Sequence, residues 1–180
     1  MSVRVTVQGS VRVYVPTTLR GLAAAVAAGG LGPAPFQAHA VTDALRAALP
    51  GAGEEDWEYA AASAAGQTSV GMLDAQEPAR RVVLAVDVPV ARPADAGDDP
   101  TLVEVDEVVP LRRVAAVLAD SEDAEGSVAA ARDAALHGTA DAPRALECCL
   151  DHELGWWATQ EIPVLLEETG RRDLGAARDV

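Results

Sequence analysis

The sequence is poor in aromatic residues and in cysteine, and it contains no lysine or asparagine. Aromatic residues make up 3% of the 180 residues, so alanine, valine and leucine must supply the core. The apolar fraction of 49% is ordinary for a globular protein. The two cysteines, Cys148 and Cys149, are adjacent, which is a poor geometry for a structural disulfide. We therefore expect two free thiols, with Cys149 bordering the core.

Long hydrophobic segments are also missing. No run of 18 apolar residues is present that could span a bilayer, and the first residues lack the apolar stretch of a secretory signal. We expect a cytoplasmic protein with one domain, because 180 residues are enough for a sizeable single core. The predicted domain covers residues 11–168, with residues 1–10 as an N-terminal extension and residues 169–180 as a charged, frayed tail.

Positive charge is scarce in the second half of the chain. There are 7 arginines and 8 acidic residues up to Pro93, but 7 arginines and 20 acidic residues from Ala94 onwards, and the formal net charge is −14. Such a field repels phosphate backbones, and no basic patch interrupts it. We therefore expect no nucleic-acid or membrane partner. A protein partner or a small ligand stays open, and the sequence predicts no oligomeric state.

Motifs for catalysis or metal binding are absent as well. The run Gly29-Gly30-Leu31-Gly32 follows a predicted helix instead of a strand, which is the wrong context for a dinucleotide-binding loop. His152-Glu153 begins like a zinc-protease motif, but Trp156 stands where the second histidine should be. The three histidines are dispersed. The sequence predicts no metal site and no cofactor, and it leaves open whether the protein is an enzyme.

The most unusual stretch is 151–166, which holds two of the three tryptophans and the only isoleucine. With Asp141 as N-cap, the apolar spacing predicts one helix from there to Pro163. On that helix three polar groups would lie within four residues of Trp157 and so become its surface neighbours. They either reach solvent beside a core stripe or line a pocket roofed by Trp157. The three are Glu153, Gln160 and Glu161.

The rest of the chain contains two patterns in turn, one typical of strands and one typical of helices. Short β-branched runs predict strands, and alanine-rich runs with capping residues predict helices. Segment 114–119 is compatible with either, and we take it as a strand antiparallel to 102–109, because the turn between them is too short for a crossover. The predicted fold class is α/β, a layered mixed β-sheet of about five strands with helices packed on it. The predicted strands are 11–15, 36–41, 81–88, 102–109 and 114–119, and the other predicted helices are 19–28, 42–49, 54–75 and 122–136.

One candidate pocket follows from this arrangement. Ligands of open α/β sheets gather at the carboxyl ends of parallel strands. Carboxylates and threonine hydroxyls at those ends could bind a cation or transfer protons, although the same groups could simply cap helices and satisfy the backbone. If the last helix crosses that edge of the sheet, its polar groups join them. The candidate pocket residues are Thr17, Thr18, Asp87, Glu153, Trp157, Gln160 and Glu161.

The two ends of the predicted domain carry a resemblance. The run VRVYVPTT at 11–18 and the run WWATQEIP at 156–163 resemble an uncharacterised family of high-GC Gram-positive bacteria, catalogued as a domain of unknown function. The resemblance covers residues 11–168 and implies no activity, cofactor or catalytic residue.

Three hypotheses for the function remain, of which one is a structural subunit that buries Trp156 in an oligomer. The leading one is a non-catalytic protein-interaction or small-ligand-binding domain, because the chain lacks both a nucleophile–base motif and metal spacing. The alternative is a small carboxylate-dependent hydrolase with its site at the strand ends beside the last helix. That enzyme would use Glu153, Glu161 and Asp87, and it requires the three carboxylates to converge around one cleft.

Overall fold

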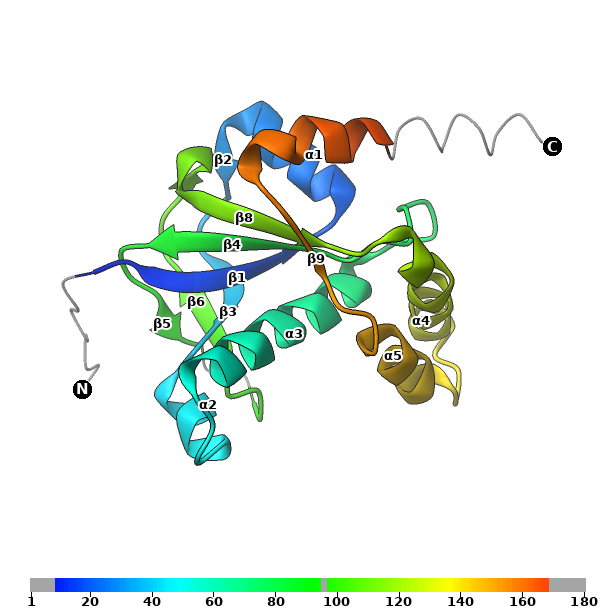
Figure 1. The fold of residues 1–180 in the computed structure, drawn as a ribbon, viewed down its shortest axis with the longest axis horizontal. Helices are drawn as coiled ribbons and strands as arrows, with labels where there is room; N and C mark the ends of the chain where they lie inside the picture. The colour runs from blue at the N-terminus through cyan, green and yellow to red at the C-terminus, as the bar shows by residue number, and fades with distance from the viewer. Residues whose placement is uncertain (1–8, 95–96, 169–180) are drawn as a thin grey trace.

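A computed structural model describes residues 9–94 and 97–168 and shows an α/β fold with a seven-stranded sheet between layers of helices (Figure 1). The predicted α/β class is therefore confirmed, but the sheet is larger than the predicted one of about five strands and is antiparallel instead of mixed. The predicted tail at 169–180 and most of the extension at 1–10 lie outside the described residues. The strands of the sheet are β1 (Val11–Thr17), β3 (Phe36–Ala40), β4 (Val82–Val88), β5 (Arg92–Pro93), β6 (Leu102–Val105), β8 (Val114–Ala119) and β9 (Gly155–Trp157).

All neighbouring strands of the sheet are antiparallel, in the order β5-β6-β3-β1-β4-β8-β9. A separate two-stranded sheet joins β2 (Gly30–Leu31) to β7 (Val109–Pro110). The helices are α1 (Leu19–Ala28), α2 (Asp43–Ala48), α3 (Glu54–Met72), α4 (Glu125–His137) and α5 (Ala142–Leu150), and residues 162–168 are also helical. Three 3-10 turns are η1 (Leu111–Arg113), η2 (Glu122–Ala124) and η3 (Thr159–Glu161).

Helix α1 forms where local signals predicted it. The Thr18 hydroxyl caps its N-terminus by accepting a hydrogen bond from the Gly21 N–H at 3.1 Å. Gly29 ends the helix with φ of 72°, in the left-handed region that glycine enters at little cost. The apolar stripe of α1 then faces the sheet, with Leu19, Leu22 and Ala25 buried.

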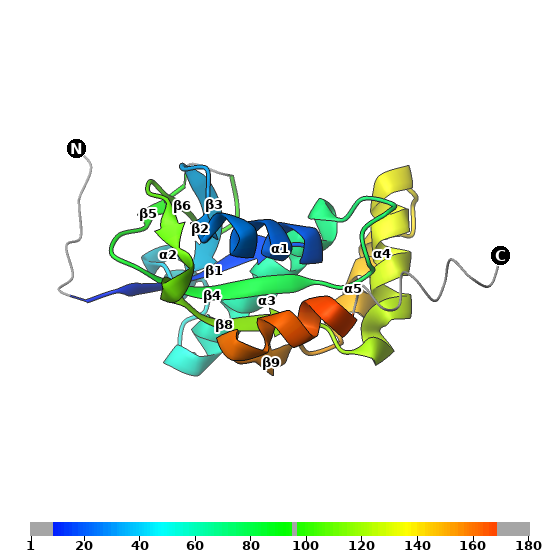
Figure 2. The same cartoon turned by 90° about the horizontal axis from the view of Figure 1, so that it is seen from above.

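The two faces of the sheet are covered differently. Helix α1 and the helical residues 162–168 pack on one face, over a core that includes Leu84, Val117 and Leu165 (Figures 1 and 2). Helix α3 packs on the other face against β1, β3 and β4, where Ala61 and Ala65 allow a close approach. Helices α4 and α5 pair beyond the end of the sheet (Figure 1). The α3 face over β8 and β9 is thus left partly uncovered.

The predicted helix from Asp141 to Pro163 is wrong, because the chain leaves it after Leu150. Residues 155–157 instead form β9, which pairs with β8 and places Gly155 opposite Ala119. The approach is close: a Cβ on Gly155 would lie 3.4 Å from the Ala119 carbonyl oxygen. A new helical segment then begins at residue 162, with Pro163 in its first turn, where a missing N–H costs little.

The predicted pairing of 114–119 with 102–109 is also wrong. Segment 114–119 is a strand, as predicted, but β8 pairs with β4 and β9. Strand β6 pairs with β3 and β5 on the far side of β1. The short 3-10 turn η1 therefore carries the chain across the sheet and does not close a hairpin. Within the described ranges, no helix has the length and apolar character that a membrane crossing requires.

Candidate functional site

A groove lies where α3 stops covering the sheet, and one face of α3 forms its first wall. The residues that line it from α3 recur at spacings of three and four, so they project from one side of the helix. The acidic groups come from its first two turns, and small residues follow. The lining residues of α3 are Glu55, Glu58, Tyr59, Ala62 and Ser63.

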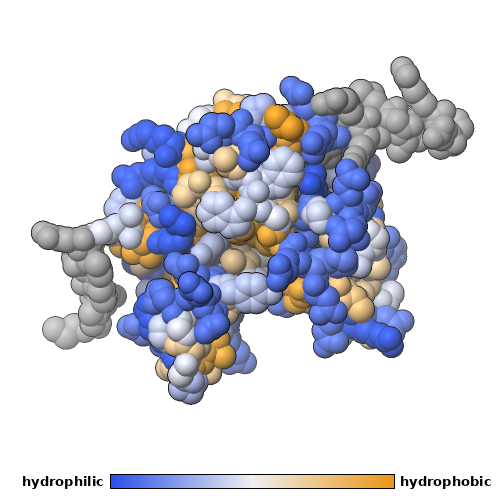
Figure 3. All heavy atoms as spheres, viewed as in Figure 1, coloured by the Kyte–Doolittle hydropathy of each residue, from blue (hydrophilic) through white to orange (hydrophobic). Residues whose placement is uncertain are grey.

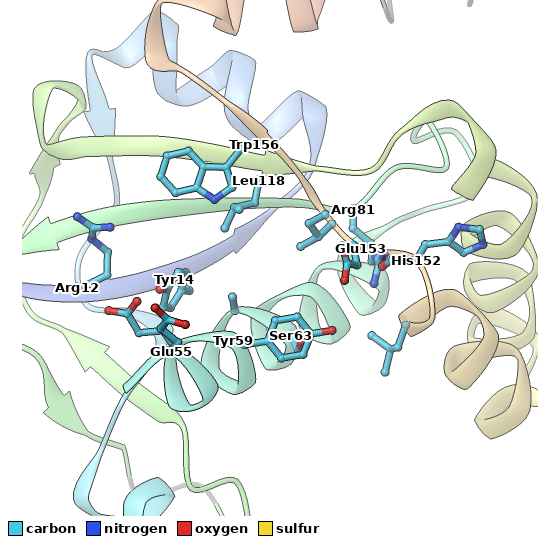
Figure 4. A pocket seen from close by; sticks show the side chains of 14 residues that line it. Arg12, Tyr14, Glu55, Tyr59, Ser63, Arg81, Leu118, His152, Glu153 and Trp156 are labelled. Carbon is cyan, nitrogen blue, oxygen red and sulfur yellow. Dashed lines mark hydrogen bonds between the residues drawn. The ribbon is translucent and has the colours of Figure 1, made fainter. Parts of the chain in front are cut away.

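The sheet forms the floor, and the segment between α5 and β9 forms the opposite wall. Tyr14 of β1 and Leu118 of β8 are buried beneath the groove, while Trp156 stands 68% exposed above it (Figure 4). The other residues of this wall are Leu150, His152, Glu153 and Leu154, and the cavity has a volume of about 400 Å³. Figure 3 shows the same side of the molecule, with pale and orange atoms gathered at its centre and blue atoms around them.

One end of the groove is anchored by a buried ion pair. The Arg81 guanidinium donates to the Asp120 carboxylate with Nη2–Oδ1 at 2.6 Å and Nε–Oδ2 at 2.9 Å. The Arg81 Nη2 also donates to the His152 carbonyl at 2.7 Å, which ties the groove wall to β4. Burial opposes the charge on Arg81, but the hydrogen bonds and charge of Asp120 outweigh it and raise the pKa of Arg81.

A second ion pair lies at the other end, and it is much more open to solvent. Arg12 donates to Asp87 with Nε–Oδ1 at 2.7 Å and Nη2–Oδ2 at 3.1 Å. The two residues face each other across β1 and β4. This hydrogen-bonded pairing raises the pKa of Arg12. Arg12 itself lines the groove, and its charge there is already matched by Asp87.

The remaining charge of the groove is negative. Glu55, Glu58 and Glu153 are exposed, and across residues 9–94 and 97–168 no arginine lies within ion-pair distance of any of them. The pKa of Tyr14 is raised, first by burial and then by the nearby charge of Glu58. The groove therefore combines two exposed aromatic rings, Trp156 and Tyr59, with three glutamates that form no direct ion pair among the described residues. The charge of Glu58 does act on Arg12, and it helps to raise the pKa of Arg12.

Most of the chain matches the model of one protein family. The model of a family described as "Family of unknown function (DUF6912)" matches residues 11–166. The chain belongs to this family. No curated protein and no solved structure matches it. The matched residues run from β1 into the last helical segment, so the whole groove lies within the part that defines this DUF6912 member.

The predicted pocket residues of this DUF6912 domain are spread over several places. Thr18 caps α1 and donates to Glu77 Oε1 at 3.0 Å, while the Thr17 carbonyl accepts from Ser69 at 2.7 Å. In the register of β1 and β4, Thr17 lies opposite Val82 and Asp87 lies opposite Arg12. The threonines and Asp87 thus stand at opposite ends of these strands, because the strands are antiparallel and not parallel as the prediction required.

The predicted residues of the last helix are also separated. Trp157 packs into the core on the α1 face, with the Arg80 guanidinium 5.7 Å from its ring centre. Gln160 and Glu161 lie exposed in η3, where Glu161 Oε2 accepts from the Ala158 N–H at 2.7 Å. Of the predicted residues only Glu153 lines the groove. The three carboxylates of the hydrolase hypothesis therefore do not line one cleft.

Sequence reasoning missed most of the groove. Trp156, Tyr59 and the two glutamates of α3 were not among the predicted site residues. A signal for α3 was present, because Glu55, Glu58 and Tyr59 are spaced as one polar stripe on a helix that is otherwise rich in alanine. No such signal existed for Arg12 and Arg81, which reach the groove only through the pairing of β1, β4 and β8. Among the described residues, no cluster of three or more His, Cys, Asp or Glu side chains could hold a metal ion.

Proposed function

We propose that this domain binds a small organic cation in the groove between α3 and the segment 150–156. A single observation carries the proposal. Trp156 and Tyr59, which are 68% and 60% exposed, stand on opposite walls among carboxylates that form no direct ion pair within the described part of the chain. Figure 4 shows the two rings on either side of the groove, with Glu153 toward one end and Glu55 toward the other.

The chemistry of these groups favours a cation with an apolar part. The face of an aromatic ring attracts a cation, by about 0.5–1 kcal/mol at exposed sites and about 2 kcal/mol when water is excluded. Carboxylates add a favourable charge that strengthens where solvent is displaced. The buried floor of Tyr14 and Leu118 offers apolar contact to the rest of the ligand. The three glutamates would repel an anionic ligand, and a neutral aromatic ligand would gain no attraction from their charge.

The size of the groove favours a small molecule over a protein. Its volume of about 400 Å³ falls in the range of about 300–1,000 Å³ that is typical of small-molecule sites. A specific protein interface would bury about 800 Å² on each partner. The net charge of −14 also supports a cationic ligand and opposes nucleic acid. Two free cysteines fit a reducing compartment, so the proposal includes a cytoplasmic location.

Three indole compounds that differ in charge test the proposal. Tryptamine carries a cationic side chain, tryptophol a neutral one and indole-3-acetate an anionic one. Calorimetric titration should show the order tryptamine, tryptophol, indole-3-acetate, with tryptamine affinity falling as salt is raised. Equal affinity for all three, or tighter binding of indole-3-acetate, would refute a cation site.

Matched variants locate the binding within the groove. Trp156→Ala should weaken tryptamine by about tenfold, since one ring face and its excluded water are lost. Tyr59→Ala should weaken it, whereas Tyr59→Phe keeps the ring and should bind nearly as the parent does. Glu153→Gln should weaken binding more than Glu147→Gln, which removes the same charge from α5 outside the groove.

A further inference from the structure

A second group of residues lies behind the groove wall, where α4 meets the segment that follows α5. Ser127, in the first turn of α4, places its Oγ 3.1 Å from His152 Nε2. The other ring nitrogen, His152 Nδ1, is 3.8 Å from Asp123 Oδ2. A hydroxyl, an imidazole and a carboxylate thus stand in a row, contributed by α4, the segment 151–154 and η2. In Figure 4 the His152 ring points away from the groove and toward α4.

One residue of this row, His152, is held through its backbone, whereas the Asp123 side chain is 75% exposed. The His152 carbonyl accepts a hydrogen bond from the buried Arg81 at 2.7 Å, which fixes the base of the imidazole. The Asp123 carboxylate accepts a hydrogen bond from the Ser121 hydroxyl, and this bond lowers the pKa of Asp123. Asp123 is therefore ionised at neutral pH and attracts a proton on the facing ring nitrogen. That tautomer leaves Nε2 free to accept the proton of Ser127.

A shallow pocket of about 330 Å³ is lined in part by Ser127. Small side chains form much of its lining, and one arginine and one aspartate stand at its border. Ser127 lies in the first turn of a 13-residue helix, whose N-terminal end favours negative charge. The lining residues besides Ser127 are Gly126, Ala130, Asp141, Arg144, Ala145 and Cys148.

We propose that Ser127 is an acyl-accepting nucleophile, with His152 as its general base and Asp123 as a positioning residue, and that the site takes esters of short carboxylic acids. The pocket of Ala130 and Ala145 would hold the acyl group, and its volume of about 330 Å³ accommodates a short acyl chain. This site adjoins the proposed cation groove, because His152 also lines the groove. The two differ in their other residues, since Ser127 does not line the groove and Trp156 does not line this pocket.

The reaction balances with water as the only second reactant. Ser127 Oγ forms a bond to the carbonyl carbon as its proton passes to His152 Nε2, and the carbonyl oxygen becomes an oxyanion near the end of α4. The ester C–O bond then breaks, and the leaving alcohol takes the proton from Nε2. Water attacks the acyl-serine, gives a proton to Nε2, and the carboxylic acid leaves as Oγ recovers that proton.

Covalent labelling tests the nucleophile directly. The full chain is incubated with a fluorophosphonate probe and analysed by intact mass and peptide mapping, and its hydrolysis of p-nitrophenyl acetate and butyrate is measured in parallel. We expect one adduct, on Ser127, and loss of at least about tenfold of the hydrolysis in Ser127→Ala and in His152→Gln.

Control variants separate this site from a nonspecific serine reaction. Ser63→Ala makes the same change at a partly exposed serine of the groove and should keep both labelling and hydrolysis. Asp123→Asn should lower the rate and alter its pH profile, while Asp123→Glu should restore part of it. Trp156→Ala should leave Ser127 labelling intact. The proposal fails if the parent chain carries no adduct on Ser127, or if hydrolysis persists in a Ser127→Ala variant with unchanged circular dichroism.

Discussion

The two ends of the groove carry the same chemical pair in different surroundings. Arg81 and Asp120 are 3% and 0% exposed in their side chains, whereas Arg12 and Asp87 are both 36% exposed. Both pairs make two-pronged contacts between neighbouring parts of the sheet. The buried pair also holds the backbone of His152, and the open pair only borders the groove.

We interpret the buried pair as an anchor that stabilises the fold, and the exposed pair as one that mainly sets the charge beside the groove. A buried ion cannot be left alone, because removing one partner strands the other in a medium of low dielectric constant. An exposed ion keeps most of its hydration and loses little when its partner goes. Burial should therefore decide how much each residue contributes to stability, even where chemistry and geometry match. Four predictions test this rule at different positions in the fold.

The largest effect should come from Asp120→Ala. The variant leaves the Arg81 guanidinium buried without its carboxylate, which costs about 3–5 kcal/mol in comparable buried pairs. It also removes the acceptor of the Arg81 backbone N–H. Urea unfolding should show this loss of free energy. The double variant Arg81→Met with Asp120→Leu should be more stable than Asp120→Ala, since it buries no lone charge. A loss below about 1 kcal/mol for Asp120→Ala would show that the pair is not an anchor.

The next effect concerns neighbours in the last helical segment. Leu165 is fully buried against the α1 face of the sheet, while Val164 beside it is 48% exposed. Leu165→Ala should cost about 2–5 kcal/mol, as other buried leucines do, because it leaves a cavity. Val164→Ala should stay within about 0.5 kcal/mol of the parent. Thermal and urea unfolding measure both, and equal losses would mean that this segment does not dock as the structure shows.

The residues before that segment also show which part of the fold could not be predicted from the sequence. Helix α1 was predicted at its observed bounds, because Thr18 and Gly29 mark its ends locally. The predicted final helix failed because strand β9 is defined by pairing with β8, about 40 residues earlier in the chain. Apolar spacing after α5 continued in phase, so the predicted helix was extended through β9 and η3 to Pro163.

Because of the same wrong helix, the prediction placed Trp157 instead of Trp156 over the pocket. Successive side chains of a strand point to opposite faces, whereas the helical projection had put Trp157 above the polar groups. In the observed pairing Trp156 lies opposite Leu118 and Trp157 opposite Val117. Leu118 faces the groove, and Val117 faces the core under α1. Trp156 is therefore the ring that a ligand can meet, and only the register of β9 reveals it.

A third prediction applies the rule to histidine. His39 is 1% exposed, between Thr101 Oγ1 at 2.7 Å and Thr68 Oγ1 at 2.9 Å from its two ring nitrogens. Burial lowers the pKa of His39 below its ordinary value of 6.5, against a smaller opposing effect of the Asp99 charge. As pH falls below 6.5, the unfolded chain takes up this proton before the folded chain does. Stability is therefore fully present above that pH and declines below it.

Urea unfolding between pH 7.5 and 5.5 measures this decline. His39→Gln should flatten it, and the change should be smaller than the effect of Leu165→Ala. A parent chain whose stability rises as the pH is lowered through this range would contradict a buried neutral His39.

The smallest effect on stability should come from Asp87→Asn, at the open end of the groove. Its partner Arg12 stays hydrated, so the loss should remain below about 1 kcal/mol and shrink further in salt. The same change frees the positive charge of Arg12 beside the groove. Tryptamine binding should therefore weaken while the fold persists, and calorimetry at low and high salt would show a difference that salt reduces. Loss of stability as large as in Asp120→Ala would remove the distinction between the two pairs. Unchanged binding at low salt would show that Arg12 does not act on the ligand, because a charge released at the rim of a site must alter the affinity for another cation there.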